Sequence, residues 1–211
     1  MYRILRTPME SMPWDDFDQV VFDIGNVLIA FQPENFLQTM FPDNPQLHQL
    51  LLSRVFHSPY WVMLDRCLVT PDEVVKKMAG PDEDLLPVIH RAVFEWVNLI
   101  PAIPAGVDAM NACRVHGKGV YLLSNYNTDF FLATRKRFSF LQDVDGEVVS
   151  GFVHILKPDP RIYNLLIGRY HLNPDRTLFI DDSAANIEGA AAAGLAGYWC
   201  SSPDDMKAFF R

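Results

Sequence analysis

The chain has 211 residues, of which 49% are hydrophobic and 21% charged, so it can bury one sizeable core with room for a small accessory domain. Its formal net charge is −8, and a surface of that sign argues against nucleic acid or an anionic membrane as the main partner. Cys67, Cys113 and Cys200 are widely separated and form no C-x-x-C pair, which argues against a disulfide framework or a structural zinc site.

The N-terminal residues lack the apolar run of a signal peptide, and no stretch reaches transmembrane length without a charge or a proline. We therefore expect a cytoplasmic protein, a monomer or a small homo-oligomer, whose partner is a small molecule.

The first clear strand is Q-V-V-F-D-I, residues 19–24, which is apolar on both faces like a buried parallel strand. Residues 1–18 before it predict an extension or an edge element. In residues 33–100 apolar side chains recur at helical spacing and no strand pattern is present, so this stretch predicts an all-helical insertion. Within it, Thr70 followed by Pro71 marks a helix start.

Beyond residue 100, predicted helices and strands alternate. The helices are expected over 105–117, 128–138, 160–171 and 186–194, and the strands over 119–125, 177–182 and 196–200, with a short strand pair over 147–155. This alternation predicts an α/β fold with a doubly wound parallel sheet. In such sheets a ligand binds beyond the carboxyl ends of the strands.

Polar side chains stand at the ends of three of these strands. Asp23 ends the first, Ser124 and Asn125 end the second, and Asp181 and Asp182 end the third. We therefore expect these side chains to meet in one crevice, although they are far apart along the chain.

These residues supply the parts that phosphoryl transfer requires. Asp23 offers a carboxylate nucleophile, Ser124 a hydroxyl donor and Lys157 a cation. Asp181 and Asp182 offer oxygen ligands for Mg²⁺. Each alone is an ordinary turn or cap residue, but their joint occurrence in this order indicates a catalytic site. Phosphoacceptor receiver domains use a similar set with the acidic pair first, and the order found here disfavours that reading.

Four segments of the chain stand in a fixed order: F-D-I-G-N-V-L, L-L-S-N, L-K-P-D-P-R-I-Y and F-I-D-D-S-A-A-N-I-E-G-A. They resemble the ordered motifs of the haloacid dehalogenase (HAD) superfamily over about residues 19–199. The resemblance implies a Rossmann-like HAD core formed by residues 1–32 and 101–211, and a small helical cap, residues 33–100, inserted after the first strand. The first motif is similar to a D-h-G-N-V branch, where h is apolar, that includes phosphatases of sugar phosphates such as α-D-glucose 1-phosphate.

The resemblance also implies catalytic roles. Asp23 would be the covalent nucleophile, Ser124 and Asn125 would hold the phosphoryl group, and Lys157 would bind phosphate and offset charge between it and the nucleophile.

A Mg²⁺ site is implied on the same grounds. Asp23 and the backbone carbonyl of Gly25 would be ligands, Asp182 is the first choice for direct ligation, and Asp181 would be a second ligand or hold a metal-bound water. Asn186 would lie nearby and orient these groups.

The chain departs from the common phosphatase pattern at Gly25, where most members carry a second Asp that protonates the leaving oxygen. An acid of the cap or hinge can replace this Asp, and Glu34, Asp65 and Glu73 are the candidates. Alternatively, the substrate has a good leaving group that departs without a proton. The third alternative is that the protein is a slow or inactive relative.

Four aromatic residues lie in or near the predicted cap: Phe31, Phe36, Tyr60 and Trp61. Their spacing favours a role as core residues. The alternative interpretation is that they line the substrate pocket.

The leading hypothesis is a Mg²⁺-dependent phosphatase of a small phosphorylated metabolite, such as a sugar phosphate, acting through an aspartyl-phosphate on Asp23. One alternative is a metal-independent 2-haloacid dehalogenase in which the same carboxylate attacks carbon. Another is a binding or regulatory protein that kept the HAD scaffold and lost turnover because of Gly25.

Overall fold

The computed structural model describes residues 4–5 and 12–210. Within them, six parallel strands form one sheet in the order β1-β6-β5-β2-β3-β4. The strands are β1 Ile4–Leu5, β2 Gln19–Phe22, β3 Gly119–Ser124, β4 Gly146–Val149, β5 Thr177–Asp181 and β6 Ala196–Trp199. The direction in which successive strands are added reverses between β2 and β5, which is where ligands bind in open sheets of this type.

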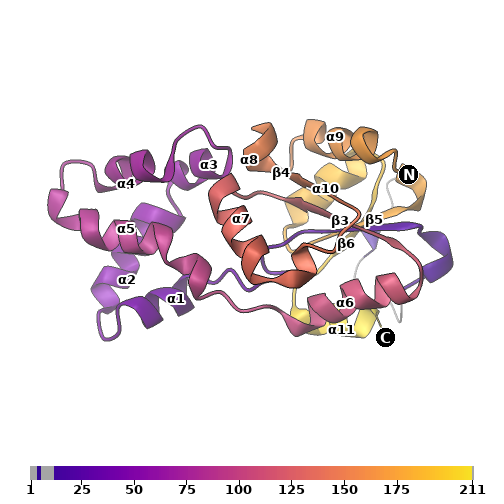
Figure 1. The fold of residues 1–211 in the computed structure, drawn as a ribbon, viewed down its shortest axis with the longest axis horizontal. Helices are drawn as coiled ribbons and strands as arrows, with labels where there is room; N and C mark the ends of the chain where they lie inside the picture. Colours follow the sequence, from indigo (N-terminus) through magenta and orange to yellow (C-terminus); the bar gives the residue numbers. More distant parts are fainter. Residues whose placement is uncertain (1–3, 6–11, 211) are drawn as a thin grey trace.

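The segment between β2 and β3 begins with an insertion in which every described element is helical, and it lies at one end of the molecule (Figure 1). Its elements are α1 Pro33–Met40, α2 Pro45–Leu51, a π-helical turn Leu52–Phe56, α3 Pro59–Asp65, α4 Pro71–Ala79, a 3₁₀ turn Glu83–Leu85, α5 Leu86–Phe94 and a 3₁₀ turn Trp96–Asn98. α4 begins as expected: Thr70 accepts from the backbone N–H of Glu73, whose carboxylate accepts from the backbone N–H of Thr70 in return.

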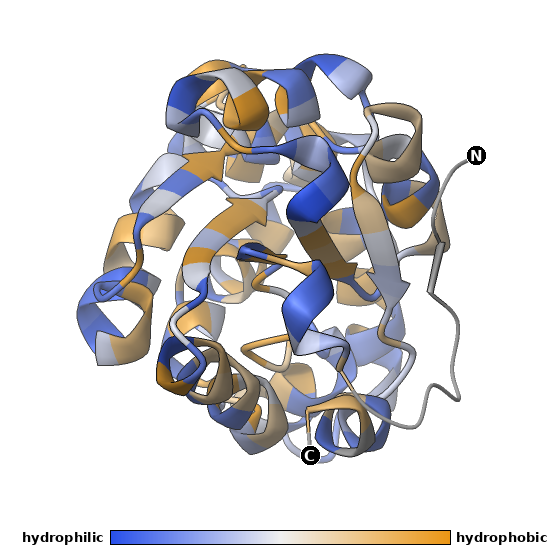
Figure 2. Cartoon of the chain, turned by 90° about the vertical axis from the view of Figure 1, so that its right-hand side faces the viewer, coloured by the Kyte–Doolittle hydropathy of each residue, from blue (hydrophilic) through white to orange (hydrophobic). Residues whose placement is uncertain are grey.

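The remaining helices surround the sheet (Figure 1). They are α6 Pro104–Val115, α7 Thr128–Arg137, α8 Ser150–Val153, α9 Pro160–Tyr170, α10 Ala184–Ala192 and α11 Pro203–Phe209, with 3₁₀ turns Trp14–Asp16, Ser139–Leu141 and Pro174–Arg176. Alternate residues of β2 point to opposite faces: Val21 packs with the residues of α9 and α10, whereas Val20 and Phe22 pack with those of α6 and α11. Hydrophobic residues dominate the inner strands, whereas the outer helices carry both kinds (Figure 2).

The α/β class and the parallel doubly wound sheet are confirmed. Two expectations need correction. The short strand pair over 147–155 is wrong, because only Gly146–Val149 is a strand and Ser150–Val153 is a helical turn. The Ser150 hydroxyl donates to the carbonyl of Asp65, and a Cβ on Gly151 would lie 2.8 Å from the carbonyl oxygen of Tyr126, so tertiary contacts determine this turn.

The second correction concerns the ends of the chain. Helix α11 at the C-terminal end was not predicted from its sequence. Of the extension or edge element expected over 1–18, the described part contains the short edge strand β1 and a 3₁₀ turn, while residues 1–3 and 6–11 lie outside the described residues.

Candidate active site

Three neighbouring strands of the sheet place the predicted site residues at one edge. Phe22 lies level with Ile180 of β5 and Leu122 of β3, so the residues that follow, Asp23 and Asp181, emerge side by side. The backbone N–H of Asp23 donates to the carbonyl of Ile180 at 2.9 Å, which holds the nucleophile candidate just beyond the last ladder pair. Ser124 is the last residue of β3, and its side chain is buried.

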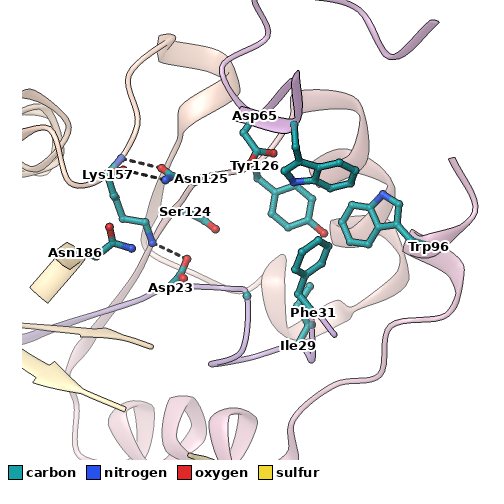
Figure 3. A pocket seen from close by; sticks show the side chains of 12 residues that line it. Asp23, Ile29, Phe31, Asp65, Trp96, Ser124, Asn125, Tyr126, Lys157 and Asn186 are labelled. Carbon is teal, nitrogen blue, oxygen red and sulfur yellow. Dashed lines mark hydrogen bonds and ion pairs between the residues drawn. The ribbon is translucent and has the colours of Figure 1, made fainter. Parts of the chain in front are cut away.

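Lys157 joins these strand ends electrostatically. Its Nζ lies 2.7 Å from Asp23 Oδ1 (Figure 3). The same Nζ lies 2.7 Å from Asp181 Oδ2 and donates to the carbonyl of Leu123 at 3.0 Å. Asn125 fixes the backbone of this lysine: its side-chain oxygen accepts from the Lys157 N–H at 2.8 Å, and its amide nitrogen donates to the Lys157 carbonyl at 3.1 Å. Both ends of the Asn125 side chain are therefore engaged by the backbone of Lys157.

The two acids after β5 are in different environments. Asp181 is fully buried, and its carboxylate accepts hydrogen bonds from Asn186 Nδ2 at 2.9 and 3.1 Å and from the Ser183 N–H at 2.8 Å, in addition to Lys157. Asp182 is partly exposed, and its Oδ2 accepts from Asn26 Nδ2 at 3.1 Å. Asp182 therefore keeps more free oxygen lone pairs than Asp181 for a further ligand.

Asn26 is a site residue that sequence reasoning missed. It adopts a left-handed backbone with φ 54°, a conformation that Asn tolerates better than most residues. Its side chain donates to Asp182 and accepts from the N–H of Phe31 at 3.0 Å, so it ties the loop after β2 to the acidic pair. The Asn of the D-I-G-N-V segment was the available signal, but it was given no role.

Gly25 lines the cavity, and it does not adopt the left-handed conformation that favours glycine. A Cβ built on it would meet only the Cβ of Phe31 at 4.0 Å, an ordinary contact. The backbone here therefore tolerates a side chain, and glycine is not required for conformational reasons.

Burial shifts the ionisation of these groups. Desolvation raises the pKa of Asp23, although the Lys157 ammonium opposes the shift. Desolvation likewise raises the pKa of Asp182, while the hydrogen bond from Asn26 opposes it. For Lys157, desolvation lowers the pKa, but Asp181 and Asp23 together outweigh it, so the net pKa is raised and the ammonium is the stable form.

The residues present fit a divalent cation. Carboxylate oxygens of Asp23, Asp181 and Asp182 lie within 4.8 Å of one another, and carboxylates are the ligands that Mg²⁺ prefers. One ammonium faces three neighbouring carboxyl groups, so ionisation of all three would leave two negative charges uncompensated in a buried place. Asp23 Oδ1 is buried and has no directed hydrogen bond, only the ion pair with Lys157. A divalent ion would neutralise both charges and use that free oxygen.

Above these groups lies a cavity of about 280 Å³. Asp23, Lys157 and Asn186 lie at one end of it, and the rings of Phe31, Tyr126 and Trp96 form the other (Figure 3). Asp65 lies at the end formed by the rings, beside Tyr126. Its walls are formed by Asp23, Gly25, Ile29, Phe31, Trp61, Asp65, Trp96, Ser124, Asn125, Tyr126, Lys157 and Asn186. Phe31 and Trp61 therefore line the pocket, which was the alternative interpretation, whereas Phe36 is a core residue and Tyr60 packs against the core.

Of the three acids considered as replacements for the missing Asp, Asp65 alone lines this cavity. Glu34 is exposed in the first turn of α1, and exposed Glu73 is used to cap α4. Burial raises the pKa of Asp65 well above its usual value, the backbone N–H of Asn127 opposes the shift, and the negative charge of Asp23 adds to it. Burial therefore favours the protonated form of Asp65 up to a higher pH than for an exposed carboxyl group.

Hydrogen bonds dock the segment that carries Asp65 onto the sheet domain. Asn127 Nδ2 donates to the carbonyl of Leu64 at 3.1 Å, and Ser150 Oγ donates to the carbonyl of Asp65 at 2.6 Å. Arg66 Nε donates to the carbonyl of His154 at 3.2 Å. These bonds join residues more than 60 positions apart, which is why no local pattern could place Asp65 in the site.

The comparisons with known proteins agree with this geometry. A model of the haloacid dehalogenase-like hydrolase family matches residues 17–194. The chain is 20% identical to the sesquiterpene phosphatase astK of Aspergillus oryzae over 86% of this chain and 88% of that protein. It is 27% identical to (S)-2-haloacid dehalogenase 1 of Pseudomonas sp. over 46% of this chain, a match that spans only 42% of the dehalogenase.

Among solved structures, a HAD family enzyme from Bacteroides thetaiotaomicron in complex with magnesium and inorganic phosphate superposes with a TM-score of 0.64 at 21% identity, over 87% of this chain and 93% of that one. In the part of this chain that is described, no helix has the length and apolarity needed to cross a membrane. The family match covers strands β2 to β5, the helical insertion and every residue of the polar end. The chain therefore belongs to the haloacid dehalogenase-like hydrolases and is a hydrolase.

Proposed function

We propose that this hydrolase is a Mg²⁺-dependent phosphatase of a small phosphorylated metabolite and that it forms an aspartyl-phosphate on Asp23. The observation that carries the proposal is the group of three carboxylates, Asp23, Asp181 and Asp182, within 4.8 Å of one another beside Lys157. A bound Mg²⁺ would be held by Asp23, Asp182 and the carbonyl of Gly25, and it would stabilise negative charge on the phosphoryl oxygens.

In this proposal an oxygen of Asp23 attacks phosphorus, and the bond between phosphorus and the substrate's alcohol oxygen breaks. The Lys157 ammonium and the Ser124 hydroxyl stabilise the phosphoryl oxygens, with the backbone N–H of Asn125 as a third donor. Asp181 and Asn186 hold Lys157 and the acidic pair in place. Water then attacks the aspartyl-phosphate, which releases inorganic phosphate and restores Asp23.

The proton for the leaving alcohol comes, in this proposal, from Asp65. This acid faces the cavity from the helical insertion, which we propose acts as the cap over residues 33–100. Its pKa is raised by burial, and this shift favours the protonated form that a proton donor needs. After the alcohol has left, the carboxylate formed on Asp65 can take a proton from the attacking water. Asp65 would thus act as the general acid and base, a role that Gly25 cannot fill because it has no side chain.

The second candidate is hydrolytic dehalogenation, in which Asp23 attacks carbon and halide leaves. The sequence similarity to a haloacid dehalogenase and the apolar end of the cavity favour it. That chemistry needs no metal, so it does not explain why the carboxylates of Asp181 and Asp182 lie so close to that of Asp23.

One assay separates the two. p-Nitrophenyl phosphate and 2-chloropropionate are each incubated with the protein in Mg²⁺ and in EDTA. We expect phosphate release that requires Mg²⁺ and no chloride release. Chloride release that is insensitive to EDTA would establish the dehalogenase instead, and silence on both substrates would favour a scaffold without turnover.

A further inference from the structure

The apolar end of the cavity constrains the alcohol part of the substrate. Ile29, Phe31, Trp61, Trp96 and Tyr126 form the walls beyond the polar end. They come from three places: the loop after β2, the helical insertion and the loop after β3. Hydrophobic residues from separate parts of the chain thus converge opposite the nucleophile, as the sticks in Figure 3 show for Phe31, Trp96 and Tyr126.

These rings support one another rather than move freely. The centroid of Phe31 lies 5.0 Å from that of Trp96 and 5.8 Å from that of Trp61, and Trp96 lies 5.8 Å from Tyr126. Phe56 packs behind Trp61 with a centroid distance of 4.8 Å. A wall of mutually packed rings is preformed, and it favours a flat apolar group that can stack on it.

Few polar side-chain groups remain at this end. The Tyr126 hydroxyl is paired with Thr134 Oγ1 at 2.9 Å. The Trp96 N–H is buried, has no polar partner and lies among aromatic rings. Among the side chains lining this end, the Asp65 carboxyl and the unpaired Trp96 N–H are therefore the groups left to bond a hydroxyl. A sugar brings several hydroxyls, and in such a pocket most of them would lose their water without gaining a partner.

Resting on the proposed phosphatase activity, we propose that this site takes phosphate monoesters of small, flat, unsaturated hydrocarbon alcohols, benzylic or allylic in type, and discriminates against sugar phosphates. The cavity of about 280 Å³ sets the size, because it is just below the range of roughly 300–1,000 Å³ typical of pockets for drug-sized ligands.

The first test measures binding without leaving-group chemistry. Benzylphosphonate and methylphosphonate, which have no ester bond to hydrolyse, are compared as competitive inhibitors of Mg²⁺-dependent p-nitrophenyl phosphate hydrolysis. Burial of the phenyl ring should make benzylphosphonate bind roughly ten- to a hundredfold more tightly. Equal inhibition constants would overturn the proposal.

The same pair keeps the test independent of turnover. If p-nitrophenyl phosphate is not hydrolysed at any Mg²⁺ concentration, the proposed activity fails, and calorimetry of the two phosphonates in Mg²⁺ still reports on the pocket.

The second test compares benzyl phosphate with glucose 6-phosphate, since both are esters of primary alcohols. We expect kcat/KM to favour benzyl phosphate by about tenfold or more, and a preference for the sugar contradicts the proposal.

A matched pair of variants locates the effect. Trp61→Leu should raise the inhibition constant of benzylphosphonate more than that of methylphosphonate. The preference for benzylphosphonate, expressed as the ratio of the two inhibition constants, should therefore decrease several-fold. Trp14→Leu is the control, because Trp14 stacks on His116 at 3.9 Å and does not line the cavity. An unchanged ratio in folded Trp61→Leu protein would remove this wall from the site; if Trp61→Leu does not fold, the wild-type comparison with the two phosphonates decides alone.

Discussion

The two ends of the cavity are built in different ways. The polar end consists of residues at or just after the ends of neighbouring parallel strands, Asp23, Ser124 and Asp181, together with Lys157. The apolar end consists of Phe31, Trp61, Trp96 and Tyr126, which come from the helical insertion and from two loops. The polar end follows from the topology of the sheet, whereas the apolar end exists only where the insertion meets the sheet domain. Under the proposed function, the polar end would carry the phosphoryl chemistry and the apolar end would select the alcohol.

The largest expected effect is at the polar end. Asp23→Asn should lower kcat by roughly 10³-fold or more, because the amide is a poor nucleophile and a poor Mg²⁺ ligand. The fold should persist, since the two side chains have nearly the same shape. Turnover of p-nitrophenyl phosphate and the melting temperature are measured together, with exposed Asp72→Asn of α4 as the control. Near-wild-type turnover in Asp23→Asn would show that the mechanism is wrong.

The next largest effect is expected from substitution of Asp65, which tests whether the helical insertion supplies the proton for the leaving alcohol. Asp65→Asn should slow hydrolysis of alkyl phosphates by about 10²–10⁴-fold but slow aryl phosphates much less, because phenolates leave without a proton. The slope of log kcat/KM against leaving-group pKa should be shallow in the wild type and steeply negative in the variant.

The pH dependence sharpens the same test. Because Asp65 acts in its protonated form, wild-type kcat/KM for an alkyl phosphate should fall as pH rises through the raised pKa of Asp65, and this alkaline limb should disappear in Asp65→Asn. A steep leaving-group slope already present in the wild type would mean that no group protonates the leaving oxygen.

A third prediction separates metal binding from phosphoryl binding. Asp182→Ala should raise the Mg²⁺ concentration for half-maximal rate by roughly tenfold or more, because a carboxylate ligand is lost. Ser124→Ala should lower kcat/KM by about 10²-fold with little change in that concentration, because its hydroxyl donates to the phosphoryl group. Mg²⁺ titrations of both variants decide, and an unchanged Mg²⁺ requirement in Asp182→Ala would remove this residue from the metal site.

A smaller gain is expected from placing at position 25 the Asp that the resemblance to phosphatases led us to expect. Gly25→Asp should speed alkyl phosphates roughly two- to tenfold, less than a full general acid provides, because Asp65 already acts. The backbone conformation of Gly25 and the 4.0 Å contact with Phe31 allow the side chain. Gly168→Asp on the exposed side of α9 is the control. A loss of rate in Gly25→Asp, with the control unaffected, would show that the added carboxylate disturbs the site.

The smallest effect concerns stability. Burial raises the pKa of Asp65 above the value of about 3.9 in an unfolded chain. Between the two values the folded state binds more protons, so the free energy of unfolding decreases as pH rises through the folded pKa. Urea titrations in EDTA from pH 5 to 8 should show this decrease, and Asp65→Asn should make it shallower while Asp72→Asn does not. Identical pH slopes in all three proteins would exclude a buried, protonated Asp65.

The contrast between the two ends explains what could be predicted. Strand 19–24, the strand ending at Ser124 and the strand before Asp182 were readable because buried parallel strands are continuous apolar runs. The start of α4 was readable from Thr70 and Pro71, since capping depends on neighbours in sequence. The turn over Ser150–Val153 was misread, because its hydrogen bonds go to Tyr126 and Asp65. Asp65 remained one of three candidates for the same reason.

The sequence by itself determined the α/β class, the parallel sheet and the set of charged residues at its carboxyl edge, because strand periodicity and strand-end positions are local properties. Only the tertiary structure decided that Asp65 and Trp61 reach the cavity, that Asn26 ties its loop to Asp182, and that Gly25 is free of conformational constraint. These features depend on contacts between residues up to 156 positions apart, and such contacts leave no periodic or short-range signal in the chain.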